Sequence, residues 1–293
     1  MQSSSCQRNI VVQNATGILN FTGLTQVSTI SVEDSPQLEV LDCPVLEKMA
    51  QLNVIQAQAL TNLSFPRLKD WRTEDGGMVT TSVNINGAPS LLDLDLGNLV
   101  DVWNYTTFGL PTDIPLTLDR LYGGPQIVSA EHITTDDCPV LLNLSYAGYV
   151  YISPAGSCSL VFHELTAAED ITLNNVDSFT LSSPLAVNGS LTLGNSTADA
   201  NRTGDNILLR FPEMTVGSSI SITSSSNSTL DLGGLKTVGG DIVVVNNTNC
   251  ALSFNNLTDA GNITILDNIG TALPIFPNLE RVGNIHLRGE IDP

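Results

Sequence analysis

A short sequence pattern returns about every 22 residues and limits what this chain can fold into more than any other feature. The pattern usually starts with an apolar residue, often Phe, and has Leu or Met three residues later. Its first positions are Phe21, Cys43, Phe65, Leu96, Leu118, Cys138, Phe162, Ser182, Phe211, Leu232, Phe254 and Phe276. A period of this length is typical of solenoids, whose turns stack because one turn alone cannot enclose a core.

A strand signature follows the pattern in most copies. Nine and eleven residues after the first position stand two apolar residues with a polar one between them, as in Ile30-Ser31-Val32, Ile171-Thr172-Leu173 and Ile263-Thr264-Ile265. Alternation with a period of two places the apolar residues on one face of a β-strand. Stacked turns would join such strands into parallel sheets, with strands about 4.8 Å apart. The sequence therefore predicts an all-β parallel β-solenoid of about 12 turns of about 22 residues.

The repeat also shows where the solenoid is interrupted. Two of the spacings are long, which predicts loop insertions at residues 72–82 and 194–206. Strand signatures dominate the rest of the chain, so the helix content should be low. The best candidates for the few short helices are residues 44–59 and 162–170.

Asn-x-Ser/Thr triplets, the acceptor signal for N-glycosylation, are more frequent than the composition explains. With 55 Ser and Thr among 293 residues, 26 Asn should give about 5 such triplets by chance. The chain has 12, at Asn14, Asn20, Asn62, Asn104, Asn143, Asn188, Asn195, Asn201, Asn227, Asn246, Asn256 and Asn262. This enrichment predicts an extracellular, N-glycosylated protein of the cell surface or cell wall.

The charge of the chain excludes several other classes of protein. Eleven Lys and Arg against 30 Asp and Glu give a net charge of −19. Nucleic-acid binding needs clustered cations, so no nucleic-acid partner is expected. A polybasic contact with a membrane surface is excluded for the same reason. Membrane attachment is expected only through a lipid anchor that this chain does not encode.

The five cysteines fit an oxidising compartment and leave one thiol over. Cys138 and Cys158 lie 20 residues apart, about one turn, which would allow a disulfide between neighbouring turns. Cys6 and Cys43 could close the N-terminal cap, and Cys250 would then be the buried leftover. Four paired cysteines allow three connectivities, so the pairing stays open. No Cys-x-x-Cys motif is present, which favours a structural role over redox chemistry.

The repeat unit resembles that of a known family. Leu235-Lys-Thr-Val-Gly-Gly-Asp-Ile-Val-Val and Leu279-Glu-Arg-Val-Gly-Asn-Ile-His-Leu are similar to turns of receptor L-domain-like proteins, in particular of fungal GPI-anchored cell-wall organisation glycoproteins. The resemblance runs from about Cys6 to Leu287. It implies a right-handed solenoid with leucine-rich-repeat character, a cell-surface location and a role in wall integrity without enzymatic activity. The Ser/Thr-rich stalk and anchor signal of that family are absent from this sequence.

The resemblance also sets the expected domain boundaries. We expect an N-terminal tail over residues 1–6 and a single receptor L-domain-like β-solenoid over residues 7–293. An N-terminal cap should occupy about residues 7–43 of that domain.

Residues that could carry catalysis are few. Asp136-Asp137-Cys138 is similar to the paired acids of pectin-cleaving β-helix hydrolases, but the Gly-His-Gly turn and the basic element of those enzymes are missing. The frame Asp-Cys-Pro-Val-Leu also occurs at Asp42, which favours a turn residue. His132, His163 and His286 show no metal-ligand spacing. We therefore expect neither an enzyme nor a cofactor; a β-helix polysaccharide hydrolase or lyase is the alternative.

The outward residues of the predicted strands offer a candidate binding face. They should form a polar ladder of Ser31, Asn53, Asn84, Thr172, Thr192, Ser221, Val243, Thr264 and His286. Sugar-binding surfaces usually add exposed aromatic side chains, and Tyr146, Tyr149 and Tyr151 are the best candidates. The expected partner is a wall polysaccharide or a surface protein. A receptor-type ectodomain that binds a protein ligand is a second alternative.

Overall fold

The computed structural model describes residues 9–69, 71–72, 78–79, 81–97, 99, 101–108, 129–135, 145–154, 158–162, 165–176, 178–181, 184–194, 207–210, 213–270 and 275–289. These residues form strands, turns and bends without any helix. Within the same residues, no helix is therefore long and apolar enough to cross a membrane. The chain divides into two compact units, Met1–Val140 (unit 1) and Leu141–Pro293 (unit 2). The single domain expected over residues 7–293 stays a prediction.

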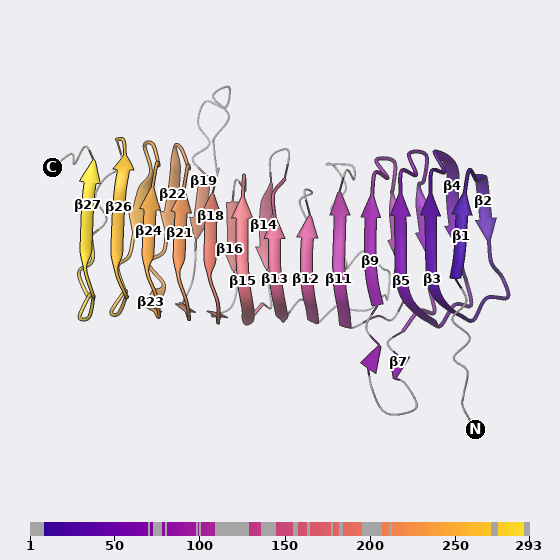
Figure 1. Cartoon of the computed structure of the whole chain (residues 1–293), viewed down its shortest axis with the longest axis horizontal. Coiled ribbons are helices and arrows are strands. Elements are labelled where there is room, and N and C mark those ends of the chain that lie inside the picture. Colours follow the sequence, from indigo (N-terminus) through magenta and orange to yellow (C-terminus); the bar gives the residue numbers. More distant parts are fainter. Residues whose placement is uncertain are drawn as a thin grey trace. The chain divides into compact units, whose positions relative to one another are not determined.

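Unit 1 is built from two parallel sheets, to which the chain contributes strands in alternation (Figure 1). The main sheet contains β1 (Asn9–Gln13), β3 (Gln26–Glu33), β5 (Lys48–Ile55), β9 (Thr81–Asn86), β11 (Asp101–Phe108) and β12 (Ser129–Thr135). The second sheet contains β2 (Thr16–Asn20), β4 (Gln37–Asp42), β6 (Asn62–Ser64) and β10 (Asp93–Asp95). The predicted insertion at residues 72–82 contains part of a short antiparallel pair, formed by β7 (Trp71–Arg72) and β8 (Met78–Val79).

Unit 2 repeats this architecture (Figure 1). Its main sheet contains β13 (Tyr146–Ile152), β15 (Ala167–Asn174), β18 (Leu191–Gly194), β21 (Ile220–Thr223), β24 (Ile242–Val245), β26 (Ile263–Asn268) and β27 (Ile285–Gly289). The three short strands β17 (Leu185–Val187), β20 (Met214–Val216) and β23 (Leu235–Val238) extend this sheet. The second sheet contains β14 (Ser159–Phe162), β16 (Ser178–Leu181), β19 (Ile207–Arg210), β22 (Ser228–Asp231) and β25 (Ala251–Ser253).

The pairing of the strands identifies the chain as a parallel β-solenoid. Ile30 lies opposite Leu52 in β3 and β5, and Ile242 lies opposite Ile263 in β24 and β26. Each step along a sheet therefore advances the sequence by about one repeat. Within the described residues, the second sheets hold four strands in unit 1 and five in unit 2, so about nine turns carry strands on two faces.

The core of each unit is a stack of inward-facing side chains. In β26, Ile263 and Ile265 are buried while Thr264 between them is half-buried, which confirms the predicted alternation. Phe65, Phe162 and other first positions of the repeat are also fully buried. Burial of one such side chain stabilises a fold by about 1.5–3 kcal/mol. A continuous apolar stack therefore holds the turns together, as expected when no single turn has a core.

The prediction of short helices over residues 44–59 and 162–170 is wrong for the residues described. The first range contains β5, in which Met49, Leu52 and Val54 are buried and pair with flanking strands. The second range holds the end of β14 and the start of β15. Both segments complete parallel ladders, and those ladders satisfy backbone groups that a helix would have satisfied internally.

Main-sheet strands end in a residue with the left-handed backbone conformation. Asn and Asp tolerate this region better than other non-Gly residues, because their short side chains bond locally. The residues are Asn14, Asp34, Gln56, Gly87, Asn175, Ser224, Asn246 and Asp267, with φ between 45° and 75°. Except after Asn14, the next residue is buried, and it is usually small, as at Ala57 and Ala88. This turn sends the chain from the main sheet toward the next side of the solenoid.

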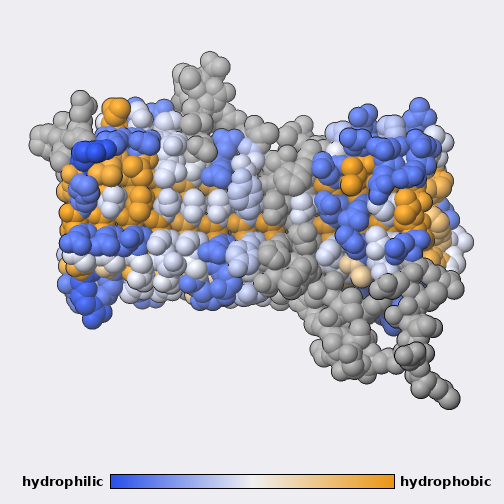
Figure 2. Space-filling model, viewed as in Figure 1, coloured by the Kyte–Doolittle hydropathy of each residue, from blue (hydrophilic) through white to orange (hydrophobic). Residues whose placement is uncertain are grey.

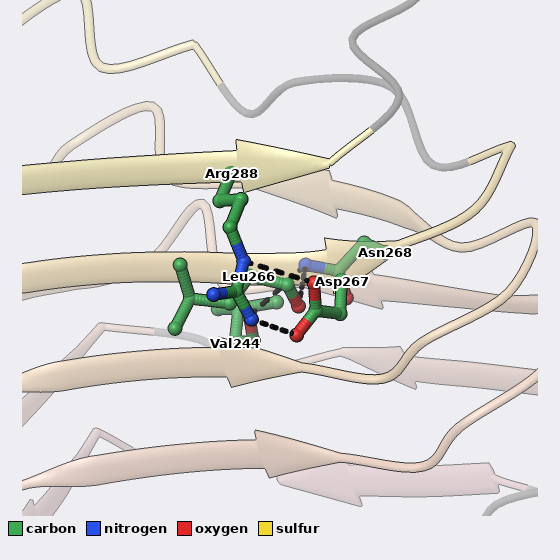
Figure 3. Close-up of polar contacts among 5 residues, drawn as sticks. All are labelled: Val244, Leu266, Asp267, Asn268 and Arg288. Carbon is green, nitrogen blue, oxygen red and sulfur yellow. Dashed lines mark hydrogen bonds and ion pairs between the residues drawn. The ribbon is translucent and has the colours of Figure 1, made fainter.

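Buried polar side chains occupy this corner in the last turns of unit 2. Ser225, Asn247 and Asn268 follow left-handed residues and are nearly inaccessible to solvent. The Nδ2 atom of Asn268 donates to the carbonyl oxygens of Val244 and Leu266, at 3.0 Å each (Figure 3). A buried amide stabilises the fold only when its donors and acceptors are paired, so these bonds fix the corner.

A second corner explains the Val-Gly-Gly-Asp-Ile sequence of the repeat. A Cβ atom on Gly239 would lie 2.1 Å from the carbonyl oxygen of Gly217 in the preceding turn, so only Gly fits there. Two residues later, Asp241 Oδ1 accepts hydrogen bonds from the backbone N–H and Nδ2 of Asn262, at 2.8 and 2.9 Å. Close backbone stacking and a side-chain bond between turns together define this side of the solenoid.

Candidate functional site

The predicted outward residues form a continuous ladder in unit 2. Each lies opposite the next in a parallel register that runs through Tyr151, Thr172, Thr192, Ser221, Val243, Thr264 and His286. Figure 2 shows rows of near-neutral and hydrophobic colour across these strands, with hydrophilic side chains along the lower border. The face is therefore regular and largely uncharged, which suits contact with an extended neutral polymer.

Two tyrosines stand at the β13 end of this ladder. Tyr149 and Tyr151 are 47% and 43% exposed, whereas Val150 between them and Ile152 after them are buried. Tyr146, the third predicted aromatic residue, is half-buried at the start of the strand. Tyr149 and Tyr151 are two positions apart in β13, so the strand alternation places both side chains on the same face.

An acidic residue that the sequence analysis did not single out lies opposite one of these tyrosines in the strand register. Tyr149 is opposite Asp170 of β15, just as Tyr151 is opposite Thr172. Asp170 Oδ1 accepts a hydrogen bond from the backbone N–H of Ser190 at 2.6 Å, which fixes the carboxylate. Aromatic faces that stack on sugar rings, next to carboxylate and hydroxyl groups that bond sugar hydroxyls, are a suitable arrangement for a carbohydrate.

The outward residues of unit 1 form a shorter ladder of different character. Ser31 lies opposite Asn53, and Asn53 lies opposite Asn84. Ser31 is only 7% exposed. Its hydroxyl donates to Glu33 at 2.7 Å, and Gln13 donates to the same carboxylate. These bonds hold the pKa of Glu33 below its usual range. In this part of unit 1, the polar side chains of Ser31, Gln13 and Glu33 therefore hydrogen-bond to one another.

The glycosylation candidates differ in their accessibility. The asparagines with an exposed side chain are Asn14, Asn20, Asn188, Asn227, Asn246 and Asn256. Asn62 and Asn262 are half-buried and donate from Nδ2 to Asp93 and Asp241. Asn104 belongs to β11, but its side chain is not described. The remaining candidates, Asn143, Asn195 and Asn201, lie outside the described residues.

The cysteines follow the predicted pairing only in part. Cys43 is a buried free thiol, so the expected bond between Cys6 and Cys43 is corrected: the side chain fills the core at the first position of its repeat. Cys250 is also free and buried, as expected for the leftover thiol. Cys158 is disulfide-bonded. Cys6 and Cys138 lie outside the described residues.

The residues considered for catalysis contribute little to the described structure. Asp136, Asp137 and His163 lie outside it, and His132 belongs to β12 without a described side chain. His286 is exposed at the end of the unit 2 ladder. Among the described side chains, no three of His, Cys, Asp and Glu converge as a metal site would require.

A shallow hollow of about 680 Å³ opens on unit 2 next to a glycosylation candidate. It is lined by Lys236, Thr237, Asn256, Thr258, Pro277, Asn278, Leu279 and Glu280. The sequence gives no signal for this hollow, because it joins residues from three successive turns. Its lining mixes one cation, one carboxylate and two amides, which offers space and polar groups to a sugar attached at Asn256.

Ion pairs between neighbouring turns use most of the described cations. Lys69 contacts Glu47, Lys236 contacts Glu213, Arg281 contacts Asp259 and Arg288 contacts Asp267. Arg288 donates to both carboxylate oxygens of Asp267 (Figure 3), and this lowers the pKa of Asp267. The pairs are exposed to solvent, so each stabilises the fold only slightly.

Known proteins do not add to this picture. Comparisons with protein-family models, with curated proteins and with solved structures return no match to the chain.

Proposed function

We propose that the protein is a non-enzymatic extracellular glycoprotein of the cell surface or cell wall, with a structural or interaction role in wall organisation. Its right-handed solenoid of about 12 turns would belong to the receptor L-domain-like family that the repeat resembles. Three features support the proposal: the parallel solenoid, the exposed N-glycosylation acceptors and the regular uncharged face of unit 2.

The exposed N-glycosylation acceptors are the strongest support for this proposal. Six sequon asparagines present their side chains to solvent, and they are distributed over both units. Glycans at these positions would add bulk and hydration to a chain that has few surface cations. A rigid solenoid coated in this way is suited to a place between polysaccharide layers.

Expression of the chain behind a secretion signal in a eukaryotic host tests this step. We expect a mass that falls on treatment with an N-glycosidase, and Asn-to-Asp conversion at exposed sequons in peptide mass spectra. Combined Asn→Gln changes at the six exposed positions should reduce that mass difference. A secreted protein without any N-glycan would refute the proposal.

Polysaccharide binding by the β13 end of the ladder is the interaction we propose. Tyr149 and Tyr151 are exposed on one face, and Asp170 and Thr172 lie opposite them in β15. Stacking on an aromatic ring and hydrogen bonds to neighbouring polar groups together bind neutral sugars without the need for positive charge. The ladder then continues in register along β18–β26, so an extended chain of sugars could follow it.

Sedimentation with insoluble β-glucan or chitin provides the test. Wild-type protein should be retained, while a Tyr149→Ala, Tyr151→Ala double variant should lose at least about tenfold in affinity if each ring contributes the roughly 1 kcal/mol typical of aromatic contacts. Leu92→Ala, which removes an exposed apolar side chain in unit 1, is the matched control. Equal retention of the variant and wild type would contradict the assignment.

The same samples separate this function from a polysaccharide hydrolase or lyase. The proposed function predicts no reducing-sugar release from glucan or pectin under conditions in which the protein binds. Release that depends on Asp136 or Asp137 would favour the enzyme instead.

A further inference from the structure

The outward face of the main sheet in unit 2 carries two neighbouring rows of small, uncharged side chains. The first row holds Thr172, Thr192, Ser221, Val243 and Thr264 in parallel register. The second row lies two positions further along the same strands and holds Asn174, Gly194, Thr223, Val245 and Leu266. Neither row contains a charged or aromatic residue. We call these two rows the neutral strip; it runs across β15, β18, β21, β24 and β26.

The neutral strip is closed even where a side chain is missing. Gly194 is buried although it lies in an outward row. A Cβ atom there would lie 2.8 Å from Asn174 Oδ1 and 3.3 Å from Thr223 Oγ1, so the side chains of the neighbouring strands cover this position. The strands that carry the strip point the same way and stay nearly parallel (Figure 1). A flat, closed platform of this kind fits a flat ligand that lies across the strands.

The acidic residues along one border of the strip are held by hydrogen bonds between turns. Asp170 Oδ1 accepts the backbone N–H of Ser190, and Asp241 Oδ1 accepts the backbone N–H of Asn262. Carboxylates fixed in this way remain acceptors for the hydroxyl groups of a ligand. The strip itself contains no Lys or Arg, and the chain has a net charge of −19. An acidic polymer would therefore be repelled, so the surface favours a neutral one.

The spacing of the strands selects the shape of that polymer. Neighbouring strands of a sheet lie about 4.8 Å apart, which is close to the rise of one hexose in a straight β-1,4-linked glycan. Each sugar of such a glycan would meet an equivalent pair of side chains on the next strand. A β-1,3-linked glucan coils instead, so its successive sugars would leave the strip.

We propose that the neutral strip binds a straight, neutral β-1,4-linked glycan that runs across the strands with one sugar per strand. This inference rests on the polysaccharide binding of the proposed function and narrows its ligand. The first sugars stack on Tyr149 and Tyr151 of β13. Further along, the hydroxyls of Thr192 and Ser221 bond sugar hydroxyls, and Val243 packs against the C–H face of a sugar. Glycans of glucose and of N-acetylglucosamine share this shape.

Calorimetric titration of the full chain with defined oligosaccharides tests this inference. The probes are β-1,4-linked trisaccharides and hexasaccharides of glucose and of N-acetylglucosamine, and a β-1,3-linked hexasaccharide of glucose. A hexasaccharide reaches about twice as many strands as a trisaccharide, so at least one β-1,4-linked hexasaccharide should bind at least about tenfold more tightly than its trisaccharide. The series that shows this gain identifies the sugar. The β-1,3-linked hexasaccharide should show no such affinity.

A charge in the middle of the strip should remove only the gain that length provides. Ser221→Glu places a carboxylate on β21, which follows β13, β15 and β18 in the sheet. Three sugars fit before it, so trisaccharide binding should be unchanged, while the hexasaccharide should fall to the affinity of the trisaccharide. Val243→Glu on β24 is a second block of the same kind. Thr229→Glu, at a half-buried position of β22 in the second sheet, is the matched control and should bind like the wild type.

The outcomes separate this inference from the proposed function. Circular dichroism of each variant checks that the β-structure is retained. Hexasaccharides that bind no better than trisaccharides, equal binding of the β-1,3-linked hexasaccharide, or full hexasaccharide affinity in both strip variants would each overturn the inference. Any of these results together with retention on insoluble polysaccharide that depends on Tyr149 and Tyr151 would leave the proposed function standing. Absence of binding to every oligosaccharide and to the insoluble polysaccharides would overturn both.

Discussion

The side-chain oxygen of Asn268 accepts two hydrogen bonds from Asn247, one from its backbone N–H and one from its Nδ2, each 2.9 Å long. Asn247 in turn accepts the backbone N–H of Ser225 at 3.0 Å. All three residues are buried, so water cannot replace these bonds. Each amide therefore satisfies the backbone of the preceding turn and ties successive turns together.

Replacement of Asn247 by Ala should destabilise unit 2. The change leaves the Ser225 N–H and an Asn268 lone pair without partners, and an unpaired buried polar group costs about 1–3 kcal/mol. We expect a loss of about 2 kcal/mol or more in the free energy of unfolding, measured by urea denaturation. Asn255→Ala, at an exposed position of the same unit, should change it by less than about 0.5 kcal/mol. Similar losses in both variants would contradict a stabilising role for the hydrogen bonds among Ser225, Asn247 and Asn268.

Close stacking of the backbone predicts a second stability effect. A Cβ atom at Gly239 meets the Gly217 carbonyl at 2.1 Å, and backbone atoms cannot rotate away as a side chain can. Gly239→Ala should therefore cost about 1–3 kcal/mol or more, visible as a lower unfolding midpoint. Gly23→Ala, where a Cβ atom would meet nothing within 4 Å, should leave the midpoint unchanged or slightly higher. Equal midpoints for Gly239→Ala and wild type would show that the corner is more pliable than the structure indicates.

The strand alternation was predictable because it is local. Ile263-Thr264-Ile265 carries its own in-and-out pattern, and the period of the repeat aligns it with the turns on either side. The segment 44–59 was ambiguous, because Met49 and Leu52 are three residues apart and fit one face of a helix as well. The segment forms a strand because β5 pairs with β3 and β9. Those neighbours are distant in sequence, so the segment alone does not predict the pairing.

The face for which we propose polysaccharide binding was predictable only in outline. Tyr149 and Tyr151 follow from alternation, but the position of Asp170 opposite Tyr149 depends on the length of the intervening loop and on the strand register. Some of the Asn residues in the glycosylation triplets also have a structural reason to be Asn. Asn14, Asn227 and Asn246 adopt positive φ, where Asn is favoured for backbone reasons, so the excess of acceptor triplets rests on the other nine.

The two free thiols should be protected from modification in the folded protein. Burial, together with the charge of Asp42, raises the pKa of Cys43 to about 12, and burial also raises the pKa of Cys250. Only the thiolate reacts with alkylating reagents, so both should stay unmodified at neutral pH and react after unfolding in urea. Peptide mass spectrometry of alkylated protein would check each site. Rapid alkylation of Cys43 in the native protein would contradict its burial.

The raised pKa of Cys43 also gives a pH dependence with a defined sign. The folded state favours the protonated thiol, so this contribution to stability is complete below the unfolded pKa of about 9 and is lost as the pH rises toward 12. A Cys43→Ala variant should lose this part of the alkaline destabilisation, although the cavity lowers its stability at neutral pH. Urea midpoints of both proteins across the alkaline range would show whether their difference narrows as the pH rises.

Glycan occupancy should separate two sequons that lie six residues apart. Asn256 is exposed and borders the hollow on unit 2, so a sugar has space there. Asn262 donates from Nδ2 to Asp241 at 2.9 Å, and its Oδ1 accepts two bonds from Asn284 at 3.0 and 3.1 Å. A glycan on this Nδ2 would replace one N–H and crowd the corner between turns.

The secreted protein should therefore carry a glycan at Asn256 and none at Asn262. Asn256→Gln should lower the mass by one glycan, whereas Asn262→Gln should leave the glycan mass unchanged. An occupied Asn262 in well-folded protein would show that the ladder from Asp241 to Asn284 can open.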